Sequence, residues 1–132
     1  MKKIFRKLIL IELALIVLML ISIFIESEEI AYMNEQLSSG FSDLYILIGG
    51  IFAVIVLLMY LVNLFLLYKF KNIGKPMYLV LLLVMALGSL LGGPIVQEPS
   101  DYLIDGFGWA MSGAILVFLY FTPIKKEFER RS

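Results

Sequence analysis

Glu12 is the residue whose type and position could do chemistry, because it is an acid within an otherwise apolar stretch. A carboxylate inside a membrane-spanning helix costs about 2.5–3.5 kcal/mol and usually faces protein or water rather than lipid. Glu12 lies about one turn inside the stretch, roughly 6 Å at the helical rise. Three interpretations are open: it bends back to meet Lys7 or a lysine of the next inner turn, it titrates in a water-filled pocket, or it makes a structural hydrogen bond.

Asn63 and Tyr60 are the expected neighbours of Glu12. Asn63 lies five residues before the inner end of the second apolar stretch, and Tyr60 lies one helical turn away on the same face. Antiparallel helices bring similar depths together, so we predict a polar cluster of Glu12, Tyr60 and Asn63 that Tyr78 or Tyr120 could join. Glu12 and Asn63 should lie within reach of a hydrogen bond or one bridging water. Such a cluster either titrates or only joins the helices by hydrogen bonds, each of which stabilises a membrane bundle by roughly 0.6 kcal/mol.

Asp105 is a second candidate acid, near the outer start of the last apolar stretch. The first turns of a helix favour negative charge, which explains an acid there by structure alone. The alternative is an outer access point for an ion or a proton. Its distance from Glu12 argues against a direct relay between the two acids.

The composition excludes several kinds of site. The chain has no Cys and no His, so thiolate nucleophiles, histidine-ligated haem and His or Cys metal sites are all excluded. The acids expected on the outer side do not follow the spacing of a calcium-binding loop. Ser, Tyr and Lys are not grouped with a base as an activated nucleophile. We therefore predict no enzyme, no catalytic residue, no metal site and no cofactor.

The positive charges suggest a topology. All eleven Lys and Arg lie in three short segments, 2–7, 69–75 and 125–131, separated by apolar stretches and by two connections that hold none. Excess Lys and Arg in short loops marks the cytoplasmic face. Both termini are therefore expected in the cytoplasm, with eight of the eleven acids on the outer side. These charges sit beside the apolar stretches and would contact lipid headgroups, so nucleic acid is not an expected partner.

Four apolar stretches divide the chain, at about 8–25, 44–68, 77–92 and 101–121. The sequence has 132 residues and is 61% hydrophobic, with a mean hydropathy of +0.97, well above the half-apolar composition of an ordinary soluble domain. Each stretch is close to the roughly 20 residues that span a bilayer, the third being the shortest. We predict one all-α domain, an integral membrane four-helix bundle, in which the helices form two antiparallel hairpins, the first with the second and the third with the fourth.

Capping residues suggest how the connections are built. Ser27 could begin a short helix lying on the outer surface, and Ser42 or Asp43 and then Ser100 could begin the second and fourth spans. Gly74 suits a left-handed helix ending in a tight inner turn, which would make the second and third spans neighbours. The basic tail would lie against lipid, with its aromatic residue, Phe128, in the interface.

Small residues gather in the outer halves of the third and fourth spans, in patterns that let helix backbones approach closely. We expect them to pack these two spans together, or else to form a homo-oligomer or a partner interface. They include Gly88, Gly92, Gly106, Ala110 and Ser112.

The last third of the chain carries a resemblance to a family. The segments 113–125 and 91–94, together with Asp105 and Phe128, resemble the ending of small four-span bacterial inner-membrane proteins of uncharacterised activity. The resemblance implies a bacterial inner membrane and implies no activity.

These features favour a protein that acts by contact, as an accessory subunit, assembly factor or regulator of a membrane complex. The expected partners are the lipid bilayer and either another membrane protein or further copies of the chain. The alternative is a small oligomeric transporter or channel in which Glu12 titrates and the glycine-rich outer halves form the gate.

Overall fold

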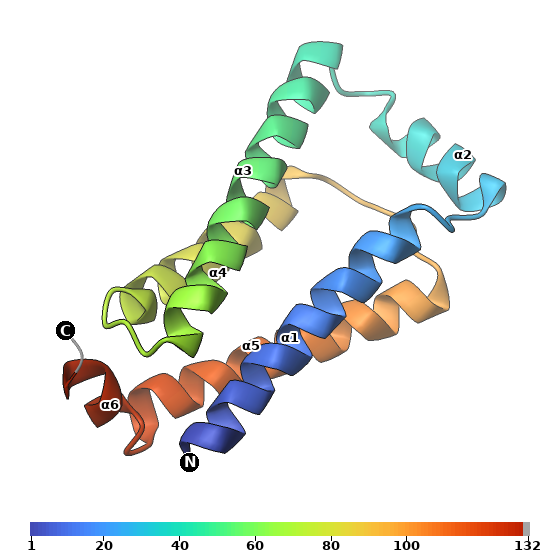
Figure 1. Ribbon diagram of the computed structural model, residues 1–132. Helices are drawn as coiled ribbons and strands as arrows, with labels where there is room; N and C mark the ends of the chain where they lie inside the picture. The colour runs from blue at the N-terminus through green and yellow to red at the C-terminus, as the bar shows by residue number, and fades with distance from the viewer. Residues whose placement is uncertain (131–132) are drawn as a thin grey trace.

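The computed structural model describes residues 1–130, and within them the chain folds into six α-helices with no strand (Figure 1). The helices are α1 Lys2–Ile23, α2 Glu28–Ser38, α3 Asp43–Tyr68, α4 Gly74–Leu91, α5 Pro99–Phe121 and α6 Lys125–Arg130. The prediction of an all-α fold is confirmed, and the four long helices coincide with the four apolar stretches.

Within the described chain, three helices are long and apolar enough to cross a membrane, namely α3, α4 and α5. The first helix is a fourth candidate when it is taken together with α2, to which it is joined at a bend of 90°. The membrane character expected from the composition therefore holds for three or four helices.

Two of the predicted caps are confirmed and one is wrong. The hydroxyl of Ser27 accepts a hydrogen bond from the Ile30 amide at 3.3 Å, and that of Ser42 accepts one from the Tyr45 amide at 3.2 Å. The fifth helix begins at Pro99, with Glu98 as its N-cap, rather than after Ser100. Proline suits the first helical position because its φ is preset and the missing amide would have no partner there.

The turn between α3 and α4 contains an unexpected left-handed residue. Phe70, rather than Gly74, takes the positive φ, at 55°. Its amide donates to the carbonyl of Leu67, and the amide of Lys71 donates to that of Leu66, both at 2.9 Å, in the Schellman pattern that ends a helix. This conformation is costly for a residue with a Cβ, and the ring of Phe70 is fully buried, so packing offsets the cost.

Helix pairing differs from the predicted hairpins. The first helix packs most extensively against α5, and α3 packs against α4, whereas α1 with α3 and α4 with α5 share much smaller contacts. The neighbourhood of the second and third spans is thus confirmed, but the pairing of first with second and third with fourth is wrong. The connection through α2 is long enough for α1 and α3 to separate, so the chain does not force them together.

The four long helices converge at one end and diverge at the other (Figure 1). We call the converging end, formed by the start of α1, the turn 69–73 and α6, the closed end. The open end is formed by α2 and the connection 92–98. The core residues lie toward the closed end, from Phe5 and Ile9 of α1 to Leu64 and Leu67 of α3 and Leu119 of α5.

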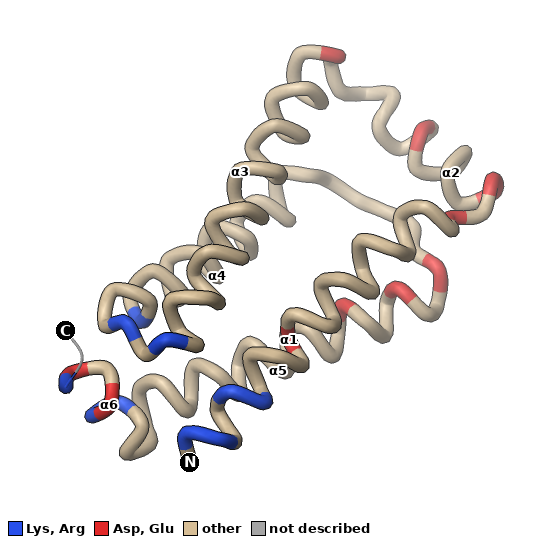
Figure 2. Tube along the Cα trace, in the orientation of Figure 1, with Lys and Arg blue, Asp and Glu red and all other residues tan. Residues whose placement is uncertain are grey.

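Charge is divided between the same two ends. Figure 2 shows Lys and Arg gathered at the closed end, and most Asp and Glu at or toward the open end. Acids at the closed end belong to α6, where Glu127 forms an ion pair with Lys2 at 2.7 Å. Arg131, one of the eleven basic residues, lies outside the described part of the chain.

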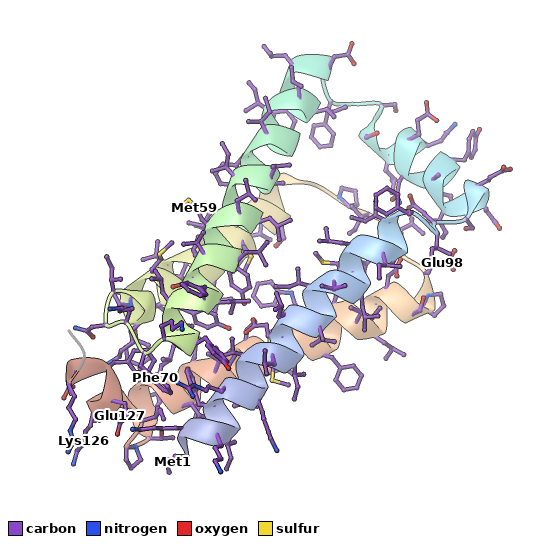
Figure 3. All side chains as sticks on the ribbon, in the orientation of Figure 1. Met1, Met59, Phe70, Glu98, Lys126 and Glu127 are labelled. Carbon is purple, nitrogen blue, oxygen red and sulfur yellow. The ribbon has the colours of Figure 1, made fainter. Side chains whose placement is uncertain are left out.

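Aromatic rings hold the closed end together. Phe70 and Phe128 have ring centroids 5.3 Å apart, and each lies 5.8 Å from the ring of Phe5. Figure 3 shows Phe70 beside the start of α1, far from Glu98 at the open end. Phe128 is fully buried, so the expectation that it contacts lipid is wrong. We call Phe5, Phe70 and Phe128 the aromatic clamp, since it joins α1, the turn and α6.

Side-chain hydrogen bonds join the elements of the open end. Asn34 of α2 donates from Nδ2 to the carbonyl of Val96 at 2.9 Å and accepts at Oδ1 from the Val96 amide at 2.7 Å. These paired bonds attach α2 to the connection 92–98. A second contact comes from Tyr45, whose hydroxyl donates to the carbonyl of Leu91 at 2.7 Å.

Candidate functional site

Glu12 lies where all four long helices meet. Its side chain is only 3% exposed, and Oε1 accepts hydrogen bonds from three hydroxyl groups, one on each of the other helices. The donors are Tyr60 of α3, Tyr78 of α4 at 2.9 Å and Ser112 of α5 at 2.8 Å. The carboxylate of α1 is therefore bonded to α3, α4 and α5 at once.

The structure brings Tyr60 to Glu12 but gives Asn63 other partners. With its amide oriented to match its neighbours, Asn63 donates from Nδ2 to the Gly74 carbonyl at 3.0 Å, and Oδ1 accepts from the Tyr78 amide at 3.1 Å. The predicted pairing of Glu12 with Asn63 is thus corrected. The reason is local: Asn63 faces the first turn of α4, and both ends of its amide are used there by the Gly74 carbonyl and the Tyr78 amide.

The basic residues do not reach Glu12. Among residues 1–130, no Lys or Arg forms an ion pair with it, and its hydrogen-bond donors are all hydroxyls. The interpretation in which Glu12 bends back to meet Lys7 is therefore not observed.

A pocket of about 210 Å³ opens above Glu12 toward the open end. All four long helices contribute to it, and its wall is mainly apolar, with Leu57 and Met85 among its members. The polar lining consists of Glu12, Tyr60, Ser112 and Asp105, together with the indole of Trp109. Glu12 is thus reached from the side of the open end.

A second pocket, of about 240 Å³, lies nearer the open end between α1, α2 and α5. It shares Met19, Ile104 and Asp105 with the first pocket, so the two adjoin. Its polar lining includes two further acids, Glu26 and Asp101. The second pocket therefore lies next to the first, on the side of the open end.

Asp105 lies at the junction of the two pockets rather than on the outer surface alone. Its carboxylate accepts a hydrogen bond from the side-chain amide of Gln97 in the connection 92–98. Asp105 and Ser112 are seven residues apart on α5 and therefore share a face of that helix. This places Asp105 above Glu12 in the same space, with no hydrogen bond between the two acids.

The small residues of α4 and α5 do not pack these helices together, because the two diverge toward the open end. A Cβ on Gly88 would lie 3.8 Å from Phe52 of α3, one on Gly92 would meet only carbonyls of its own helix, and one on Gly106 would meet no described atom within 4 Å. Ala110 is exposed. The predicted packing between these spans is therefore corrected.

Ser112 and Tyr78 are the two hydroxyl donors to Glu12 that the sequence indicates least clearly. Ser112 was assigned to helix packing, but it is buried and donates to Glu12. A signal for it exists in the sequence, since Asp105, Gly108 and Ser112 recur at the spacing of one helix face. Tyr78 was one of two optional members of the cluster; Tyr120, the other, bonds instead to the Lys75 carbonyl at 3.2 Å.

Comparison with known proteins identifies no relative of this chain. No family model, no curated protein and no solved structure matches the chain. The site therefore has to be interpreted from its own residues.

Proposed function

We propose that the chain crosses a bacterial inner membrane four times, with both termini in the cytoplasm and α2 on the outer surface. The charge division supports this topology, because Lys and Arg of short loops stay on the cytoplasmic side. The 22 residues of α1 extend about 33 Å, enough to cross the hydrocarbon core alone. The 90° bend then directs α2 along the surface.

A pair of reporters tests this topology. An enzyme active only in the periplasm and a fluorescent protein that folds only in the cytoplasm are each fused to the C-terminus. We expect fluorescence without periplasmic activity. The opposite result would overturn the orientation.

Within that topology we propose that the protein acts by contact with another membrane protein, as an accessory subunit, assembly factor or regulator, and catalyses no reaction. The observation that carries this proposal is the unused row of small residues on α5. Gly106 and Ala110 are one helical turn apart and exposed, and a Cβ on Gly106 meets open space. Such rows let a second helix approach closely where no hydrophobic effect drives association in lipid.

The test is isolation in mild detergent at native expression levels, followed by identification of co-purifying proteins. We expect a defined partner that Gly106→Leu removes. Gly108→Leu is the matched control, because it is the same change two residues along α5, on the side that lines the pocket. A lone monomer, or equal recovery of the partner with both variants, would overturn the proposal.

The pocket favours a second candidate, a small oligomeric transporter with Glu12 as the titrating group. A carboxylate reached by a pocket from one side is what a proton-coupled site needs. Proton flux into liposomes, followed with an enclosed pH-sensitive dye, should be lost in Glu12→Gln. Flux that is unchanged by this substitution would exclude that role for Glu12.

A further inference from the structure

We infer that the pocket above Glu12 binds a small lipophilic organic cation, of the alkylammonium or arylammonium class. The ligand would bind this chain alone, whichever membrane protein the chain contacts.

The lining of the two adjoining pockets carries charge of one sign. The charged residues that line the two adjoining pockets are all acids: Glu12, Glu26, Asp101 and Asp105. No Lys or Arg contributes to either lining, and the basic residues of the described chain gather at the closed end. A cation passing from the open end toward Glu12 therefore meets negative groups along its path and no positive one.

The carboxylate of Glu12 keeps one oxygen largely open to a ligand. The three hydroxyl donors converge on Oε1, whereas Oε2 accepts only from Tyr78, at 3.0 Å, and shares that hydroxyl with Oε1. A carboxylate offers about four acceptor positions, so Oε2 has capacity that the protein leaves unused. The hydroxyls fix the group in place, and among residues 1–130 no Lys or Arg forms an ion pair with it.

The wall of the pocket is mainly apolar and aromatic. Leu57, Leu82 and Met85 provide an apolar surface, and the rings of Tyr60 and Trp109 border the same space. Aromatic faces attract organic cations, and this attraction is stronger where water is excluded. A hydrated metal ion would have few oxygen ligands here. An ammonium ion with apolar substituents would contact both an acid and an apolar wall.

The size of the pocket limits the ligand. Pockets that hold drug-sized molecules are about 300–1,000 Å³, and this one is about 210 Å³. Benzyltrimethylammonium is a suitable probe, because it is small, permanently charged and apolar around the charge. Its neutral isostere, neopentylbenzene, has the same shape without the charge.

Trp109 makes the experiment direct, because it is the single tryptophan of the chain and lines the pocket. The full-length protein in lipid nanodiscs is titrated with benzyltrimethylammonium while its tryptophan fluorescence is followed. We expect a saturable change in fluorescence, and binding weakened about tenfold or more in Glu12→Gln, since a buried charge has lost its partner. Glu98→Gln, at the open end and outside both linings, should bind as the wild type does.

A second variant keeps the test decisive if Glu12→Gln folds poorly. Gly108 lines the pocket and a Cβ there meets no described atom within 4 Å, so Gly108→Leu places its side chain in the pocket space and should abolish the titration. Gly106→Leu, the same change on another side of α5, should leave the titration intact.

Equal binding of neopentylbenzene, or undiminished binding in both Glu12→Gln and Gly108→Leu, would overturn the inference. Because the partner test uses the same two glycine variants with the opposite expectation, the two proposals fail separately.

Discussion

The hydroxyl of Tyr78 lies 2.9 Å from Oε1 and 3.0 Å from Oε2 of Glu12, so one phenol spans the whole carboxylate. The backbone amide of the same tyrosine donates to Asn63. Tyr78 therefore links the two polar residues that the sequence suggested should meet directly. Asn63 fixes the start of α4, and α4 in turn presents the phenol to Glu12.

Tyr78→Phe should destabilise the bundle by about 0.6–1.7 kcal/mol, the range of interhelical hydrogen bonds in membranes. The ring stays in place and only the hydroxyl is removed, so packing is kept. The measurement is the free energy of unfolding in mixed micelles with increasing SDS. Tyr102→Phe is the matched control, since Tyr102 is 71% exposed, and an equal effect of both changes would contradict the role of Tyr78.

Asn63→Ala should destabilise the turn between α3 and α4 by about 1–3 kcal/mol, because it removes two buried hydrogen bonds, one to the Gly74 carbonyl and one from the Tyr78 amide. Thermal unfolding in detergent measures the loss as a lower Tm. Asn72→Ala provides the comparison, because Asn72 lies in the same turn with an exposed side chain. A Tm equal to that of this control would show that the amide of Asn63 is dispensable.

Phe128→Ala should release α6 from the closed end. The change removes a fully buried ring from the aromatic clamp, and large-to-small changes of this kind cost about 3–5 kcal/mol in packed cores. Trypsin should then cleave faster at Lys125 and Lys126. Phe121→Ala, at a ring that is 84% exposed, should not change the cleavage rate, and resistance of Phe128→Ala to trypsin would argue against the clamp.

Asn34→Ala should detach α2 from the connection 92–98, because the paired bonds to Val96 are lost. Hydrogen exchange at the Val96 amide should accelerate, while exchange at the closed end stays the same. Gln36→Ala removes a bond that lies within α2 itself, to Tyr32, and serves as the control. Unchanged exchange at Val96 in Asn34→Ala would mean that other contacts hold the open end.

The sequence was sufficient for the helices and insufficient for their arrangement. Long apolar stretches, with Ser27 and Ser42 as caps, indicate where helices begin and end, because these signals are local. Helix pairing was not local: the spans are apolar around most of their circumference, so no hydrophobic face marks which neighbour each one takes. The partnership of α1 with α5 depends on contacts between residues about a hundred positions apart, such as Glu12 with Ser112.

The candidate site was predictable in part for the same reason. A charge in an apolar stretch identifies Glu12 without any knowledge of its surroundings, and helical spacing gave Tyr60 its face. The sequence indicates the depth of Asn63 but not its partners. Asn63 bonds to backbone groups of α4 rather than to Glu12, and these groups come into position only because α4 begins at Gly74.

The concentration of buried side chains toward the closed end separates the tasks of the two halves of this molecule. Folding rests on residues such as Phe5, Leu67 and Leu119, which are nearly or fully inaccessible, whereas the walls around Trp109 carry little of that load. Substitutions among the upper wall residues could therefore change what the cavity admits while the scaffold keeps its strength. A protein built this way can change the shape and polarity of its cavity through mutation without first acquiring extra stability.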